Sequence, residues 1–268
     1  MNPVEKFRAE CLDEIAAFGA DRDIAAKTNE WISLANKGKY SYHFEFLGRP
    51  VIQYPQDMVA VQELIWSIKP DLIVETGIAH GGSLVMSAGM LALLDYCDAA
   101  GAAFDPRQSR RRVVGIDIDI RPHNRAAIEA HPLAHKIELI QGSSIDPAVV
   151  ETVRKMASGH ETVLVLLDSN HTHDHVLAEL EAYAPLTSRG SYCVVFDTII
   201  ETLPSDMFQD RPWSHGDNPR TAVHEFLKRL AEEGRTASDG TPLDLVIDKT
   251  IENKLLITVA PDGYLRRR

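Results

Sequence analysis

The sequence is short of positive charge: 28 Lys and Arg residues stand against 39 Asp and Glu residues, for a formal net charge of −11. A protein that binds a nucleic-acid backbone needs a concentrated basic face, so we expect no nucleic-acid partner. Two short basic runs, residues 110–112 and 266–268, are interpreted as a solvated loop and a frayed terminus.

Cysteine and long apolar runs are also scarce. The three cysteines, Cys11, Cys97 and Cys193, are far apart and form no CxxC pair. This pattern is typical of reduced thiols and not of a disulfide framework. No apolar run approaches the length of a membrane span, and the first residues do not begin a signal peptide. We therefore expect a soluble, cytoplasmic protein with no membrane span.

From about residue 69 onward, short apolar runs alternate with helical patterns. The five runs are residues 71–75, 112–117, 136–140, 162–168 and 191–197. Helices are expected at residues 83–96, 122–130, 147–157, 173–184 and 221–233. Continuous apolar runs indicate strands covered on both faces, and the alternation predicts a parallel sheet. A final hairpin of strands at 243–247 and 254–259 would complete a Rossmann-like α/β sheet of seven strands.

The N-terminal region has a different character. Helical patterns at residues 4–18 and 24–34 precede an aromatic-rich stretch at 40–46. We interpret residues 1–55 as a helical extension that serves as a lid or an oligomerisation segment, and expect a homo-oligomer. Residues 56–268 then form the main domain, beginning with a helix that Asp57 can cap.

The turn after the first expected strand, VETGIAHGGS at residues 74–83, is the most informative stretch. Glycine permits positive φ and close approach of a ligand to the backbone, and Ser83 can cap a helix whose N-terminal amides attract a carboxylate. The P-loop lysine is absent, and Glu75 replaces the first glycine of the dinucleotide motif. An ordinary βα turn is the alternative. The candidate cofactor-binding residues here are Glu75, Gly77, Gly81, Gly82 and Ser83.

Acidic residues end the second strand, at Asp117 and Asp119. A carboxylate there can accept hydrogen bonds from ribose hydroxyls, although such residues also serve as helix caps. We favour Asp117 because it lies nearer the strand end. Ser143 follows the third strand, where an adenine ring would lie, and Glu75 would meet the ammonium of a methionyl group. This order is typical of proteins that bind S-adenosylmethionine (SAM).

The fourth and fifth strands end in Asp168 and Asp197. Neighbouring parallel strands bring such ends together in the crevice where ligands bind, and paired carboxylates suit a hard divalent ion. In the alternative, Asp168 touches only the cofactor and Asp197 caps a turn. His171 adds a titratable group, whereas the spacing of His171, His173 and His175 does not indicate zinc. We expect His173 and His175 on the surface.

An ordered series of motifs resembles the cephalosporin hydroxylase family over about residues 50–230. The motifs are YPQD (54–57), VETG with GGS (74–77 and 81–83), GIDIDIR (115–121), LDSNH (167–171), YAPL (183–186) and GSY (190–192). Despite the name, its members look like class I SAM-dependent methyltransferases. Their relatives include metal-dependent O-methyltransferases that act on sugars of antibiotics and glycolipids.

The resemblance implies roles for particular residues. Asp168 would be a Mg²⁺ ligand, and His171 the base that takes the proton of the acceptor hydroxyl. The family commonly has Glu-Asp after the fifth strand, whereas this sequence has Phe196-Asp197, so one carboxylate is missing. Thr198, water or a substrate oxygen would then complete the shell. Residues 203–220 correspond to a variable substrate loop, in which Trp213 and His215 would contact the acceptor.

The sequence therefore predicts a SAM-dependent O-methyltransferase that uses Mg²⁺ and methylates a hydroxyl of a sugar, natural-product or glycolipid acceptor. Two alternatives remain. A cephalosporin-hydroxylase-like oxygenase would need two histidines and one carboxylate around iron, and no such spacing accompanies the glycine turn. A SAM-binding protein without metal-dependent catalysis is supported by Phe196.

Overall fold

Seven strands form one mixed sheet in the order β5-β4-β3-β6-β7-β9-β8 in the computed structural model, which describes residues 2–268. The strands are β3 (Leu72–Thr76), β4 (Arg112–Asp117), β5 (Ile137–Gln141), β6 (Val163–Leu167), β7 (Tyr192–Val195), β8 (Leu245–Ile247) and β9 (Tyr264–Arg267). Strands β3 to β7 pair in parallel, and β9 runs antiparallel to both β7 and β8. The predicted Rossmann-like seven-stranded α/β fold is confirmed.

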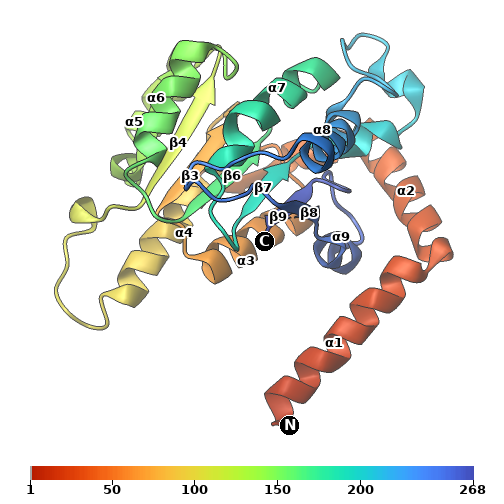
Figure 1. The fold of residues 1–268 in the computed structure, drawn as a ribbon, viewed down its shortest axis with the longest axis horizontal. Coiled ribbons are helices and arrows are strands. Elements are labelled where there is room, and N and C mark those ends of the chain that lie inside the picture. Colours follow the sequence, from red (N-terminus) through yellow and green to blue (C-terminus); the bar gives the residue numbers. More distant parts are fainter. Residues whose placement is uncertain (1) are drawn as a thin grey trace.

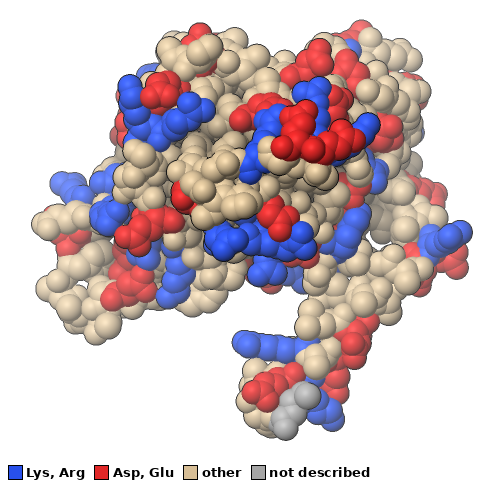
Figure 2. Space-filling view, in the orientation of Figure 1, with Lys and Arg blue, Asp and Glu red and all other residues tan. Residues whose placement is uncertain are grey.

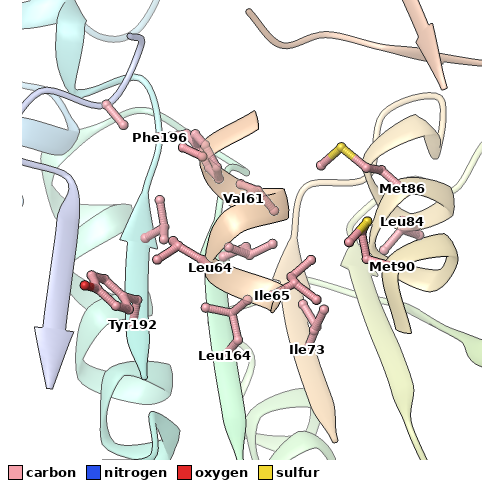
Figure 3. Packing of buried hydrophobic residues seen from close by; sticks show 14 of the residues in the cluster. Val61, Leu64, Ile65, Ile73, Leu84, Met86, Met90, Leu164, Tyr192 and Phe196 are labelled. Carbon is pink, nitrogen blue, oxygen red and sulfur yellow. The ribbon is translucent and has the colours of Figure 1, made fainter. Parts of the chain in front are cut away.

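Helices cover both faces of this sheet (Figure 1). They are α3 (Pro55–Ile68), α4 (Gly82–Asp98), α5 (Pro122–Glu129), α6 (Pro147–Ala157), α7 (His173–Tyr183), α8 (Pro219–Glu233) and α9 (Lys249–Leu255). Side chains alternate along a strand, so Ile73 packs under α3 and α4 while Leu72 and Val74 pack under α6, α7 and α8. Figure 3 shows the first of these two layers, with Leu64 and Leu84 above Ile73.

The predicted C-terminal hairpin is wrong. Residues 249–255 form α9, and the last strand of the sheet is β9, inserted between β7 and β8. The interpretation of residues 266–268 as a frayed end is wrong for the same reason. Arg267 is only 1% exposed, and its guanidinium donates hydrogen bonds to the Thr187 carbonyl and to Asp239. A buried Arg is tolerated here because its charge is paired.

The role predicted for Asp57 is also wrong. Tyr54 is the N-cap of α3, and Asp57 lies inside the first turn. Its buried carboxylate accepts hydrogen bonds from the Val259 backbone N–H at 2.9 Å and from the Tyr264 hydroxyl at 2.7 Å. These hydrogen bonds tie residues 254–259, which we expected to form a strand, to α3. The backbone N–H of Val259 is therefore not free to pair with a neighbouring strand.

The N-terminal region consists of α1 (Pro3–Ala20), α2 (Arg22–Lys37) and a hairpin of β1 (Phe44–Phe46) and β2 (Arg49–Val51). Helix α1 extends away from the sheet (Figure 1). Phe7 on this helix is 64% exposed. Acidic and basic side chains are interspersed along this helix and over the face of the main domain shown in Figure 2. In the described part of the chain, no helix combines the length and the apolar character that crossing a membrane requires.

Candidate active site

The glycine turn brings the ends of β3 and β6 into contact. Gly77 has φ +79°, and a Cβ atom there would lie 1.9 Å from the carbonyl oxygen of Asp168. Only glycine allows this approach, so it fixes the loop that carries Asp168. The predicted cap is wrong, because Gly81, at φ +80°, is the N-cap of α4. The Ser83 hydroxyl instead donates a hydrogen bond to Glu75.

Glu75 is a buried carboxylate with one unpartnered oxygen. It is 2% exposed, and among residues 2–268 no hydrogen-bond donor reaches its Oε2. Burial raises the pKa of Glu75 to about 7, against the lowering effect of the Ser83 hydrogen bond. Ser83 lines a cavity of about 210 Å³ beside this turn, but Glu75 does not line it. The orphaned oxygen fits the ammonium expected from the sequence, which would supply the missing donor.

Replacement of Glu75 by glutamine is expected to flatten the pH dependence of folding stability. The folded protein holds a proton on Glu75 up to about pH 7, whereas an unfolded glutamate loses it near 4.5. Wild-type stability therefore falls as pH rises through this window, by about 2–4 kcal/mol relative to Glu75→Gln. Urea unfolding of both ligand-free proteins at pH 5 and pH 8 measures this difference. Equal losses in the two proteins would show that Glu75 ionises normally.

Asp117 lies in a cavity of about 220 Å³ at the ends of β4 and β5, together with Ser143. Its two carboxylate oxygens each accept one backbone hydrogen bond at 3.0 Å, from Ile78 and from Asp119. Each oxygen keeps a lone pair for a ligand hydroxyl. Asp119 is exposed and does not line the cavity, so the geometry supports the choice of Asp117.

A second cavity, of about 210 Å³, shares Gly77 and Ser169 with the first. Its lining includes six of the residues predicted from the sequence, and these are Gly77, Gly82, Ser83, Asp168, His171 and Asp197. The two adjoining cavities therefore gather the predicted site residues, apart from Glu75 and Gly81, which lie outside both linings.

Asp168, His171 and Asp197 form a cluster of three possible metal ligands. One ligand atom from each lies within 4.8 Å of the others, and His171 Nε2 is 3.1 Å from Asp197 Oδ2. Removal from water raises the pKa of Asp168 well above its usual range, and the charges of Asp197 and Glu75 add to this rise. A cation would relieve this unfavourable charge, so the donor set fits a divalent ion with remaining positions open.

The residues on either side of Asp197 do not complete this cluster. The ring of Phe196 is buried beside Val61 in the layer under α3 (Figure 3). A glutamate at position 196 would place a carboxylate among apolar side chains. Thr198 is buried, and its hydroxyl donates to the Pro261 carbonyl at 2.6 Å, so the geometry does not support the expected ligand role of Thr198.

His173 and His175 are not the surface residues that we expected. Their side chains are each 19% exposed. His175 Nε2 lies 3.1 Å from the Ser144 hydroxyl, and His173 Nδ1 lies 2.8 Å from the Thr221 hydroxyl. The two imidazoles thus point to different partners, away from a common metal ion.

Sequence reasoning missed three polar residues that support the site. Gln53 Nε2 donates to Asp168 Oδ2 at 3.1 Å, and the buried Glu179 accepts from the Ser169 hydroxyl at 2.7 Å. His175 lines the cavity of Asp117. A signal existed for Glu179, because it interrupts the apolar face of its helix with a charge. No periodicity marks Gln53, which precedes α3.

Comparison with known proteins identifies relatives of this chain. A profile of the family described as "Rhamnosyl O-methyltransferase/CmcI" matches residues 38–268. A rhamnosyl O-methyltransferase of Mycobacterium bovis (strain BCG / Pasteur 1173P2) is 28% identical over 221 residues, covering 79% of this chain and 73% of the relative. Another, of Mycobacterium leprae (strain TN), is 25% identical over 227 residues, covering 83% and 82%.

Two solved structures of CmcI share the fold. One, described with Mg and SAM, has a TM-score of 0.53 at 18% identity and covers 85% of this chain and 77% of that chain. An apo-structure has a TM-score of 0.51 at 18% identity, with coverages of 84% and 76%. The family resemblance inferred from the sequence motifs is confirmed. The chain belongs to the rhamnosyl O-methyltransferase/CmcI family.

Proposed function

We propose that the protein is a SAM-dependent O-methyltransferase that uses Mg²⁺ and acts on a hydroxyl of a sugar or natural-product acceptor. The observation that carries this function is the pair of adjoining cavities at the carboxyl ends of the parallel strands, with the Asp168–His171–Asp197 cluster in one of them. Ligands of open α/β sheets bind at this edge.

The first cavity fits the adenosine part of the cofactor. Asp117 would accept hydrogen bonds from the ribose hydroxyls, and Ser143 would contact the adenine ring. Gly77, Gly81 and Gly82 would hold the methionyl part, and Glu75 would pair with its ammonium. When bound, SAM supplies an electrophilic methyl group on its sulfonium.

In the second cavity, Asp168 and Asp197 would hold the metal ion, and His171 would take the proton of the acceptor hydroxyl. Bound Mg²⁺ would lower the pKa of the acceptor hydroxyl. His171 is oriented by Asp197, 3.1 Å from its Nε2, and imidazole is the most common general base in enzymes. Gln53 holds Asp168 in place through its hydrogen bond.

A hydroxyl-rich acceptor is supported by the side chains beside the cluster. Tyr42, Gln53 and His80 line the same cavity, and each can exchange hydrogen bonds with sugar hydroxyls. The relatives named rhamnosyl O-methyltransferase point to the same acceptor class. The residue set favours this function over the oxygenase alternative, because the cluster offers one imidazole and two carboxylates where the iron triad has two imidazoles and one carboxylate.

The function is tested by incubating the protein with labelled SAM, Mg²⁺ and a panel of rhamnose-containing glycolipids and glycosylated natural products. Methyl transfer that stops with chelator and returns with Mg²⁺ is the expected result. Methyl transfer that persists in exhaustive chelator would support the SAM-binding site but would show that the reaction needs no metal ion. Oxygen consumption with Fe²⁺ and no methyl transfer would favour the oxygenase.

Replacement of Asp117 by alanine is expected to weaken binding of the demethylated product, S-adenosylhomocysteine, by about 1.5–3 kcal/mol, the scale of hydrogen bonds to a charged group. Calorimetric titration measures this change. Asp119→Ala is the matched control, because the Asp119 side chain lies outside the cavity. NAD is expected not to bind. Unchanged affinity in Asp117→Ala would remove this residue from the cofactor site.

The N-terminal region completes the proposal. Pro50 and Val51 of β2 and Gln53, which follows this strand, line the second cavity, and this supports a lid role for part of residues 1–55. Phe7 on helix α1 is an exposed apolar side chain, and this supports a homo-oligomer in which a second copy of the chain covers helix α1. The three free cysteines support a cytoplasmic location.

A further inference from the structure

Trp213 lines one cavity of the site and contacts a residue that lines the other. It lies between β7 and α8 and lines the cavity that contains Asp117 and Ser143. The edge of its ring system meets the ring of His171, with centroids 4.7 Å apart and an interplanar angle of 83°. His171 lines the other cavity. One aromatic side chain therefore contacts the space proposed for adenosine and the imidazole proposed as the base.

The backbone next to Trp213 is held by hydrogen bonds from several elements. Ser214 pairs with Asp217, whose carboxylate accepts the backbone N–H of His173 at 2.7 Å. The carboxylate of Glu201 accepts the Gly216 N–H at 2.9 Å. The guanidinium of Arg211 lies 5.4 Å from the indole. These contacts hold the loop that carries the indole, which lines the cavity of Asp117 and packs against His171.

The structure does not support the contacts with the acceptor that we expected from Trp213 and His215. His215, expected to contact the acceptor, has its Nε2 2.5 Å from the Leu203 carbonyl oxygen and lines neither cavity. Trp213 lines the cavity of Asp117 and not the one that contains the metal cluster. The Trp213 side chain therefore forms part of the wall of the proposed cofactor cavity and also packs against His171.

We propose that Trp213 is a positioning residue that couples cofactor binding to the placement of the His171 imidazole, an inference that rests on the proposed methyltransferase function. The imidazole has two neighbours that set its orientation, Asp197 at Nε2 and Trp213 against its ring. Adenosine bound in this cavity would pack on the indole and would prevent it from withdrawing from His171. The proton acceptor is therefore correctly placed once the cofactor is bound.

Fluorescence tests the cofactor contact without any turnover. The chain has three tryptophans, and Trp31 and Trp66 lie on α2 and α3, outside both cavities. Titration with S-adenosylhomocysteine is expected to change the emission along the same curve that calorimetry gives. The Trp213→Phe variant, which keeps an aromatic ring, should bind the ligand but lose this emission change.

Kinetics test the coupling to His171. Trp213→Leu is expected to lower kcat about 10-fold at saturating substrates, the upper scale of one edge-to-face aromatic pair, with little change in the acceptor KM. Trp213→Phe should restore most of kcat. A wild-type kcat in Trp213→Leu, or ligand binding without an emission change in the wild type, overturns the coupling. Failure of the wild type to bind S-adenosylhomocysteine would instead overturn the proposed function.

Discussion

Replacement of His171 by alanine is expected to lower kcat by about 10²–10⁴, the usual contribution of a positioned general base. The affinity for S-adenosylhomocysteine should stay nearly unchanged, because His171 lines the cavity of the metal cluster and not that of Asp117. Single-turnover kinetics on the wild type and the variant, with cofactor binding measured by calorimetry, separate the two effects.

His173→Ala is the matched control for this experiment. Its imidazole lies two residues further along the chain but faces Thr221 and Glu225, outside both cavities. It should keep near-normal turnover. If His171→Ala also kept wild-type turnover, the histidine would have no part in proton transfer, and activation of the hydroxyl would fall to the metal ion alone.

Replacement of Asp168 by asparagine is expected to abolish tight metal binding and to reduce turnover by roughly 10²–10³, as expected when several kcal/mol of charge stabilisation are lost. The variant should nevertheless fold well without ligands. Burial and the charge of Asp197 already disfavour the ionised form of Asp168, so removal of its charge relieves repulsion in the empty site.

Mn²⁺ titration and thermal unfolding together test this prediction. The expected variant has lost its metal affinity and has a Tm no lower than the wild type. Asp174→Asn, which removes an exposed carboxylate at the start of α7, is the control and should change neither quantity. Undiminished metal affinity in Asp168→Asn would place the ion elsewhere.

The central part of the fold and the meeting of the site residues could be predicted because both depend on local patterns. The apolar runs of β3 and β6 are buried along their whole length, as strands covered on both faces must be. Parallel strands bring their carboxyl ends to one edge, so the sequence predicts that Asp168 and Asp197 lie together and that Asp117 lies at the same edge of the sheet.

The incorrect predictions concern segments whose structure depends on contacts with residues far away in the sequence. The sequence Tyr-Leu-Arg-Arg of β9 gives a weak strand signal, and Arg267 is buried only because Asp239 and the Thr187 carbonyl meet it. Residues 254–259 look like a strand, but the buried Asp57 binds the Val259 N–H from α3. His175 likewise gained its place from Ser144, 31 residues earlier.

The interior position of β9 also has a consequence for biosynthesis. Residues 264–267 pair with β7 on one side and β8 on the other, although every other strand of the sheet precedes them in the chain. Until these residues are available, β7 has one open edge with unpaired backbone groups, and β8 has no partner in the sheet. The folding chain must keep the open edge of β7 from aggregating until β9 joins it.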